Sequence, residues 1–220
     1  MILYKYCDEK GGLDLLKNSR LKITNLADIN DPFEFLPQRD YEIEEFDKLV
    51  KHLYEYQKEN YRILSLSKLA CNIVMWGHYC NKHKGILFKI NTDKISDING
   101  NRLEDALKEV TYAKERPKIN LQGNDIKEME KSLELITYTK FEDWKYEEEV
   151  RAIIEYDHKE NYDYLDIPAD SILEVVLGIN STWETNTLVK VLREEKRFEH
   201  VKLKKAEIDK ERYFLNYNDL

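Results

Sequence analysis

The sequence predicts an α+β fold in which a curved or split mixed β-sheet is flanked by helices. Runs typical of strands and amphipathic runs typical of helices are mixed without strict alternation, which disfavours a doubly wound sheet. No segment repeats at a fixed spacing, so solenoids and propellers are excluded. Since 42% of the 220 residues are hydrophobic and no Pro/Gly/Ser-rich linker occurs, we expect a single domain over residues 1–220.

The first half of the chain mixes short strands with helices. Apolar and aromatic runs of strand length occur at residues 2–6, 21–26, 61–67 and 85–90. Helices are predicted at residues 13–18, 41–58 and 72–81, and the second of these has apolar side chains at helical spacing on one face. Gly11 and Gly12 are expected to precede the first helix. Asn30-Asp31-Pro32 is a turn signal, because proline biases the residue before it away from helix.

Strands dominate the second half of the chain. After a loop at residues 95–104, the strand candidates are residues 107–113, 147–156, 164–167, 172–179, 200–204 and 213–217. Two amphipathic helices are predicted at residues 125–137 and 182–196, the latter with Asn180, Ser181 and Thr182 as capping candidates.

Composition and charge exclude several classes of function. The formal net charge of −8 disfavours non-specific binding to a nucleic-acid backbone. Cys7, Cys71 and Cys80 form no CxxC pair, so neither a disulfide framework nor a cysteine zinc site is indicated. No export signal and no apolar run of membrane-spanning length is present. We therefore expect a cytoplasmic protein with no membrane partner.

Four separated segments resemble domain-of-unknown-function family 2971 (DUF2971). They are LYKY at residues 3–6, NDPFE at 30–34, MWGHYCNKHKG at 75–85 and KFEDWKYEEEVR at 140–151. The label of that family carries no reaction, so a mechanism must come from the residues and from a weaker comparison at the level of fold.

That weaker comparison is with ADP-ribosyltransferases of the toxin type, which cleave NAD. The resemblance consists of a basic residue, a Ser-x-Ser segment and a Glu-x-Glu segment in this order, here Lys5, then Ser65 and Ser67, then Glu147 and Glu149. It implies that Lys5 holds the phosphate or ribose of NAD, that the serines shape the nicotinamide pocket, and that Glu149 is the essential carboxylate with Glu147 beside it. The first position is usually arginine or histidine, and lysine lacks the bidentate fork of arginine.

Strand geometry would bring the two glutamates together, because alternate side chains of a strand point to the same face, here Glu147, Glu149 and Arg151. A fixed carboxylate in a dry pocket stabilises the positive charge that develops on ribose during glycosidic cleavage. The alternative interpretation is a solvated strand face with cross-strand charge pairs. The two serines, likewise, could serve only to satisfy local backbone groups.

An aromatic and polar cluster supplies the remaining candidates for cofactor binding. Trp76, His78 and Tyr79 lie in the predicted helix at residues 72–81, and Tyr4 lies on the first strand beside Lys5. Core packing is the competing interpretation for Trp76 and Tyr79. We predict no metal site there, since His78 and His83 lack the i, i+4 spacing of a helical zinc pair.

The turn at residues 30–34 also has two interpretations. It is either an Asx-stabilised turn with Phe33 anchored in the core, or a loop over the pocket in which Asp31 or Glu34 touches a ligand.

Three functions remain open at this point. The first is an ADP-ribosyltransferase-like enzyme using NAD, with an unknown protein or nucleic-acid acceptor, as in a bacterial or phage toxin or defence effector. The second is a non-catalytic module that binds a protein or nucleotide. The third is a metal-dependent hydrolase or nuclease that uses the paired glutamates.

Overall fold

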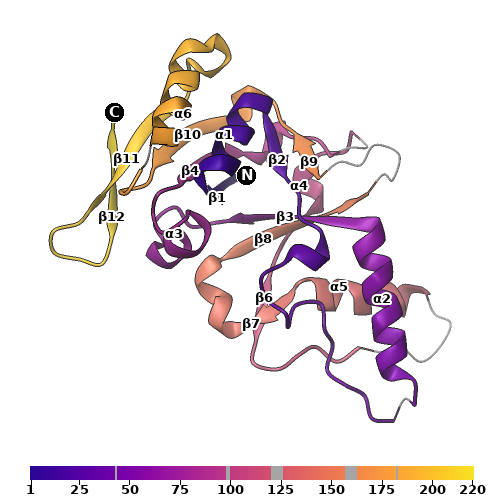
Figure 1. Cartoon of the computed structure of the whole chain (residues 1–220). Coiled ribbons are helices and arrows are strands. Elements are labelled where there is room, and N and C mark those ends of the chain that lie inside the picture. The colour runs from indigo at the N-terminus through magenta and orange to yellow at the C-terminus, as the bar shows by residue number, and fades with distance from the viewer. Residues whose placement is uncertain (43, 98–99, 120–125, 157–162, 182) are drawn as a thin grey trace.

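The computed structural model describes residues 1–42, 44–97, 100–119, 126–156, 163–181 and 183–220. Eight strands from this part of the chain form one open sheet in the order β12-β11-β10-β4-β1-β3-β8-β5. Neighbouring strands are antiparallel except β10 and β11, which are parallel. Helices flank this mixed sheet (Figure 1), so the predicted α+β class is confirmed.

The strands and helices have the following bounds. The strands of the large sheet are β1 (Ile2–Cys7), β3 (Tyr61–Ser67), β4 (Ile86–Asn91), β5 (Leu107–Glu109), β8 (Glu149–Glu155), β10 (Ile172–Leu177), β11 (Lys202–Ile208) and β12 (Leu215–Asp219). Two small sheets pair β2 (Arg20–Lys22) with β9 (Tyr164–Asp166) and β6 (Thr111–Ala113) with β7 (Thr139–Phe141). The α-helices are α1 (Glu9–Asn18), α2 (Phe46–Asn60), α3 (Ile73–Tyr79), α4 (Leu103–Ala106), α5 (Ile126–Thr137) and α6 (Trp183–Glu194). The 3₁₀ turns are η1 (Leu26–Asp28), η2 (Thr92–Lys94), η3 (Glu142–Glu147), η4 (Ala169–Ser171) and η5 (Lys196–Phe198).

The two faces of the sheet bury different apolar clusters. Helices α1 and α6 pack on one face, where Leu16 and Leu188 join Phe88 of the central strand β4 in the main core. On the opposite side, α3 contributes the fully buried Trp76 to a second cluster that includes Leu87. In Figure 1, α2 and α5 lie on the side of β3 and β8 that faces away from α1.

The sheet parts between β1 and β3. These strands pair at one register position among the described residues, Tyr4 opposite Ser67. Four residues away along β3, Ile63 instead forms an isolated bridge with Thr24. Between these two contacts, the ammonium of Lys5 donates a hydrogen bond to the carbonyl of Ser65 at 3.0 Å. A side chain therefore occupies the gap where a backbone ladder would otherwise continue, because an unpaired peptide carbonyl is costly to bury.

The first helix begins earlier than predicted. Asp8 caps α1 by accepting a hydrogen bond from the amide of Gly11, so both glycines lie inside the helix. Gly12 is required there by packing, because a Cβ atom at this position would lie 2.5 Å from Ile86 Cδ1. The prediction that the glycines precede the helix was wrong since it considered only helix propensity.

Several other boundaries differ from the prediction because the chain changes partners. The predicted strand 107–113 is divided into β5, which pairs with β8, and β6, which pairs with β7. Leu26 belongs to η1, which Asn25 caps, rather than to the strand near Leu21. The helix predicted from residue 41 begins at Phe46, and β7 was not predicted at all. The predicted starts at Asp125 and Thr182 lie outside the described residues.

Candidate functional site

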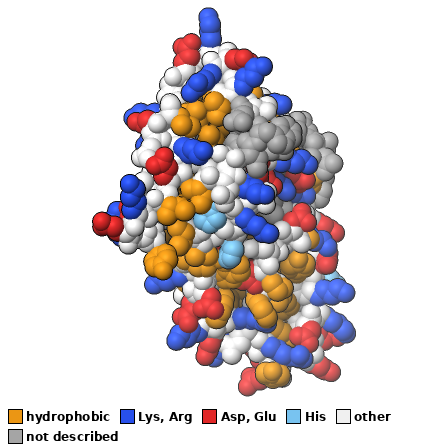
Figure 2. All heavy atoms as spheres, turned by 60° about the vertical axis from the view of Figure 1, so that its left-hand side comes forward, with side chains coloured by type: hydrophobic (Ala, Val, Ile, Leu, Met, Phe, Trp, Pro, Cys, Tyr) orange, Lys and Arg blue, Asp and Glu red, His pale blue; other side chains and the backbone are white. Residues whose placement is uncertain are grey.

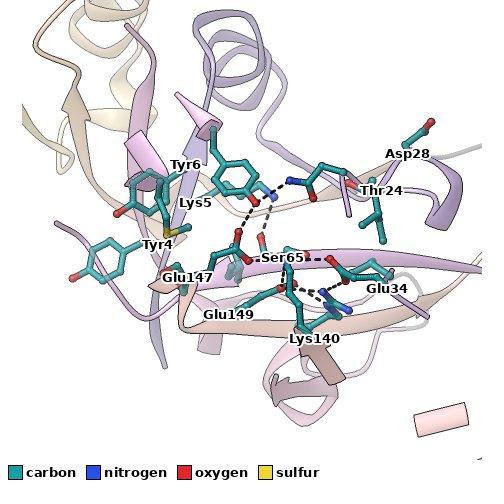
Figure 3. Close-up of a pocket in the computed structure, with 18 residues that line it drawn as sticks. Tyr4, Lys5, Tyr6, Thr24, Asp28, Glu34, Ser65, Lys140, Glu147 and Glu149 are labelled. Carbon is teal, nitrogen blue, oxygen red and sulfur yellow. Dashed lines mark hydrogen bonds and ion pairs between the residues drawn. The ribbon is translucent and has the colours of Figure 1, made fainter. Parts of the chain in front are cut away.

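A cavity of about 240 Å³ lies where β1 and β3 part. Its wall is formed by β1, β3 and β8, by the segment that contains η1, and by α3 and β7. Seven of the nine residues predicted for the site line it: Tyr4, Lys5, Ser65, Ser67, Tyr79, Glu147 and Glu149. Figure 3 shows the carboxylates of Glu147 and Glu149 on one side of the cavity and Lys5 on another. Residues far apart in the sequence thus meet in one hollow.

The two glutamates reach the cavity by different routes. Glu149 is the first residue of β8, whereas Glu147 ends η3. Glu148, between them, has a left-handed φ of 39° and is exposed. The prediction of one continuous strand through residues 147–151 was therefore wrong, because the chain turns at Glu148. At this turn the amide of Glu149 donates a hydrogen bond to the hydroxyl of Tyr112 at 2.8 Å.

The acidic pair belongs to a buried cluster of three carboxylates and two cations, which we call the charged cluster. Its members are Glu34, Lys140, Glu147, Glu149 and Arg151. Each side chain is 5% exposed or less. The alternative of a solvated strand face is thereby overturned, because β7 and residues 30–35 cover this end of β8.

Arg151 and Lys140 hold the cluster together. Arg151 Nε lies 2.8 Å from Glu149 Oε1 and Arg151 Nη2 lies 2.9 Å from Glu149 Oε2, which is a bidentate pair. Arg151 Nη2 also donates to Glu34 Oε2 at 2.6 Å. Lys140 Nζ donates to Glu147 Oε2 at 2.6 Å and lies 3.1 Å from Glu34 Oε1. Every carboxylate therefore contacts at least one cation.

The two glutamates have opposite pKa shifts. Burial alone would raise the pKa of Glu149, but Arg151, Lys140 and a hydrogen bond from Ser65 outweigh it and lower the pKa to about 2. Burial raises the pKa of Glu147, and Lys140 and Tyr79 only partly offset this effect. Paired carboxylates whose environments push their pKa values apart are typical of acid/base sites. Glu149 is thus a permanent anion near neutral pH, and Glu147 is the group better suited to exchange a proton.

Tyr79 connects Glu147 to the turn at residues 30–34. Its hydroxyl donates a hydrogen bond to Glu147 Oε1 and accepts one from the Asn30 amide at 3.3 Å. Burial and the adjacent Glu147 carboxylate raise the pKa of Tyr79, so the phenol stays protonated.

The residues of β1 and β3 play distinct parts. Lys5 is half-buried, and the desolvation of its ammonium lowers its pKa. Ser67 is 1% exposed, and its hydroxyl accepts a hydrogen bond from the Leu69 amide at 3.0 Å, which is the local structural role considered for the serines. The same hydroxyl donates to the Glu147 carbonyl at 2.6 Å. Ser65 is half-buried and bonds to Glu149. The hydroxyls of Tyr4 and Tyr6 point away from the carboxylates in Figure 3.

Trp76 and His78 lie apart from this cavity. Trp76 is fully buried, and its Nε1 donates to the Tyr217 hydroxyl at 2.9 Å, as the core interpretation expected. His78 is exposed and its Nδ1 lies 3.0 Å from the Tyr146 hydroxyl, in a neighbouring hollow. His78 is one position from Tyr79 and therefore points to another side of the helix. Trp76 instead packs into the second core cluster with Tyr6 and Leu87.

The turn at residues 30–34 combines both of its predicted interpretations. Asp31 Oδ1 accepts a hydrogen bond from the Phe33 amide at 2.9 Å, so the Asx turn is confirmed. Phe33, however, is 61% exposed, and the predicted anchor was wrong. Phe35 is the anchor, because its left-handed φ of 61° turns the ring into a cluster with Leu26 and Ile63. Glu34 lines the cavity as part of the charged cluster.

Lys140 is the main residue of the site that the sequence interpretation missed. It opens the KFEDWKYEEEVR segment, but no strand was predicted there, so nothing indicated that its ammonium would meet two glutamates seven and nine residues later. A lysine within a run of acidic residues normally indicates a solvated surface. The aromatic residues around it, Phe141 and Trp144, were the available signal that this segment is not purely solvent-exposed.

No group of three His, Cys, Asp or Glu side chains among the described residues is arranged to hold a metal ion. None of the described helices combines the length and the apolar character that a membrane crossing requires.

Comparison with known proteins agrees with the resemblance seen in the sequence. Residues 75–152 match the model of DUF2971, a family of proteins of unknown function. This DUF2971 region extends from α3 to β8 and includes Tyr79, Lys140 and both paired glutamates. No curated protein and no solved structure matches the chain.

Proposed function

We propose that this protein is an ADP-ribosyltransferase-like enzyme that cleaves NAD. The observation that carries the proposal is the meeting of Lys5, Ser65 and Glu149, from three different strands, in one cavity. They occur in the order that the toxin-type transferases use. The same cavity contains a second glutamate whose pKa is shifted in the opposite direction from that of Glu149.

The chemistry follows from the two carboxylates. In the proposed step, the bond between the ribose C1′ and the nicotinamide nitrogen breaks, and its electron pair neutralises the pyridinium ring. Positive charge develops on the ribose, and the Glu149 anion stabilises it in a water-poor site. Water or an acceptor then attacks C1′, and the ionised form of Glu147 takes the proton of that nucleophile. Nicotinamide leaves as a neutral molecule, so no proton donor is needed for its departure.

The size of the cavity limits what enters it. Pockets for drug-sized ligands usually have 300–1,000 Å³, whereas this cavity has about 240 Å³. It therefore suits the nicotinamide and adjoining ribose rather than the whole dinucleotide. Lys5 is already bonded to the Ser65 carbonyl, which favours a role in shaping the wall over the expected grip on a phosphate.

A non-catalytic binding module is the second candidate. It is favoured by the completeness of the charged cluster, because buried carboxylates that are all paired with cations also occur as structural elements. A divalent ion is a poorer fit, since Lys140 and Arg151 already pair with the three carboxylates between which it would have to sit.

The proposal is tested by following release of nicotinamide from NAD by the purified chain and three Glu→Gln variants. We expect Glu149→Gln and Glu147→Gln each to lower the rate by at least about 100-fold, the scale for losing one preorganised electrostatic group or one general base. Glu148→Gln is the matched control, because Glu148 lies between them in the sequence but is exposed. Its rate should equal that of the wild type.

Thermal denaturation of each variant separates loss of chemistry from loss of fold. Glu149→Gln leaves Arg151 with a weaker partner, so this variant should also melt at a lower temperature, and its rate is to be measured well below that transition. Absence of both NAD cleavage and NAD binding at millimolar concentration in the wild type would exclude the transferase and leave the binding module.

A further inference from the structure

A second hollow adjoins the cavity and is bordered by aromatic rings. Its wall includes Phe33, His78, Trp144 and Tyr146, together with Asn30, which also lines the first cavity. Phe33 is 61% exposed, and His78 is exposed as well. Figure 2 shows a face of the molecule on which hydrophobic side chains gather beside histidines within a mostly charged surface. We call the second hollow the aromatic hollow.

The rings of the aromatic hollow are packed against one another. The ring centroids of Trp144 and Tyr146 are 6.0 Å apart, and those of His78 and Trp144 are 6.2 Å apart. The His78 ring is also fixed by the contact of its Nδ1 with the Tyr146 hydroxyl. Rings that hold each other in this way lose little further freedom on binding a ligand, which favours affinity.

Two contacts connect the aromatic hollow to the charged cluster. The Lys140 ammonium lies 4.7 Å from the centroid of the Trp144 ring, and it bonds at the same time to Glu147. The ring of His78 meets that of Tyr79 edge to face, and Tyr79 also bonds to Glu147. The two hollows therefore share a wall, and a ligand with two ring systems joined by a linker could occupy both.

The charge of the aromatic hollow indicates which ring fits. Asp31 and the exposed Asp143 bring acidic groups to its wall. A carboxylate accepts hydrogen bonds but cannot donate them, so it selects a ring that carries an amino group. Adenine offers such an exocyclic amine and a flat face for stacking.

We propose that the aromatic hollow binds the adenine ring of the dinucleotide whose nicotinamide end enters the cavity, with Trp144 as the stacking residue. This inference rests on the proposed function, because it assigns the second half of the same substrate. It accounts for a cavity that is too small for the whole dinucleotide.

Calorimetric titration of the full chain tests the adenine site with three probes. These are a non-hydrolysable carbocyclic NAD analogue, AMP and nicotinamide mononucleotide. We expect AMP to bind to the wild type. Trp144→Ala should lower the affinity for both the NAD analogue and AMP by about 5- to 150-fold, the range for losing one base–aromatic stack. The affinity for the mononucleotide should not change. Trp144→Phe keeps a stacking ring and should restore most of the affinity. Phe214→Ala, which removes an aromatic side chain 37% exposed outside this hollow, is the control.

The outcomes distinguish this inference from the proposed function. If the mononucleotide binds but AMP does not, or if Trp144→Ala leaves the NAD analogue unaffected, the adenine site is overturned and the cavity assignment stands. If arginine methyl ester binds in a Trp144-dependent manner and AMP does not, the hollow holds a guanidinium group instead, which also overturns the inference. If AMP binds through Trp144 and the mononucleotide does not bind, the adenine site stands and the nicotinamide cavity fails.

Discussion

Among single residues, Arg151 donates four hydrogen bonds within and next to the charged cluster. It donates hydrogen bonds to Glu149, to Glu34 and, at 2.7 Å, to the carbonyl of Thr137, while its own side chain is 2% exposed. Breaking a buried ion pair by removing one partner usually costs about 3–5 kcal/mol, because the remaining charge stays buried without compensation. The planar fork of the guanidinium matters here as much as its charge.

We predict that Arg151→Lys destabilises the fold by about 2–5 kcal/mol, although it keeps the positive charge. Lysine can reach one of these acceptors but cannot serve three directions at once. Urea denaturation measures the change in the free energy of unfolding. Arg39→Lys is the control, since Arg39 is 55% exposed and its pair with Asp47 should contribute less than about 1 kcal/mol. Equal effects of the two substitutions would show that the bidentate contacts of Arg151 are not important for stability.

The element that brings Glu34 to the cluster is the turn at residues 30–35. Its conformation is fixed by the Asx contact of Asp31 and by Phe35, which packs against Leu26 and Ile63 near α2. Phe33, two residues earlier, lies at the surface. The turn is therefore anchored in the core at Phe35, next to the charged cluster, and its other end is held by the hydrogen bond from Asn30 to the Tyr79 hydroxyl.

Two phenylalanine substitutions should consequently differ in their effect. Phe35→Ala removes a ring that is 3% exposed, and we expect a loss of about 3–5 kcal/mol in unfolding free energy. Phe33→Ala should change it by less than about 1 kcal/mol, because the ring is mostly exposed. Thermal or urea denaturation of both variants provides the comparison. A larger cost for Phe33→Ala would mean that the anchor of the turn has been assigned to the wrong residue.

At the scale of the whole molecule, the charged cluster should link stability to pH. The folded pKa of Glu149 is about 2, below the value of about 4.3 for an unfolded glutamate. A lowered folded pKa contributes stability above the unfolded pKa, and this contribution, on the order of 3 kcal/mol, is lost as the pH falls from about 4 towards about 2. The contribution of Glu147 to stability has the opposite sign, because its folded pKa is raised. Ionisation of Glu147 destabilises the fold, and its protonation as the pH falls removes this destabilisation.

Unfolding free energies measured from pH 7 to pH 2 test these signs. The stability advantage of the wild type over Glu149→Gln should shrink as the pH falls below about 4. Relative to Glu147→Gln, the wild type should instead gain stability as the pH falls through the raised pKa of Glu147. The exposed variant Glu148→Gln should follow the wild type throughout. The opposite pKa shifts would be contradicted if the stability differences of Glu149→Gln and of Glu147→Gln from the wild type changed with pH in the same direction.

How much of this molecule was predictable depends on the range of the interactions. Strands β1, β3 and β4 were predicted almost to the residue, because an apolar run bounded by turn residues is a local signal. The meeting of Lys5, Ser65 and Glu149 was expected only from the resemblance to the transferases. The ion pair between Lys140 and Glu34 was not predicted, because the two residues lie more than a hundred positions apart and the strand that carries Lys140 has no local sequence pattern. Phe33 was predicted as the anchor instead of Phe35, because a left-handed φ at a phenylalanine leaves no trace in the sequence.

The parting between β1 and β3 also divides the large sheet into two sides. Each side has its own continuous ladder, from β12 to β1 and from β3 to β5, and Tyr4 and Ser67 join them at one pair. Among the described strands of the large sheet, no other neighbouring pair is joined by so few backbone register positions. The architecture thus places Glu149, which is held in the ladder of β3 and β8, directly beside the most sparsely paired junction of the described sheet.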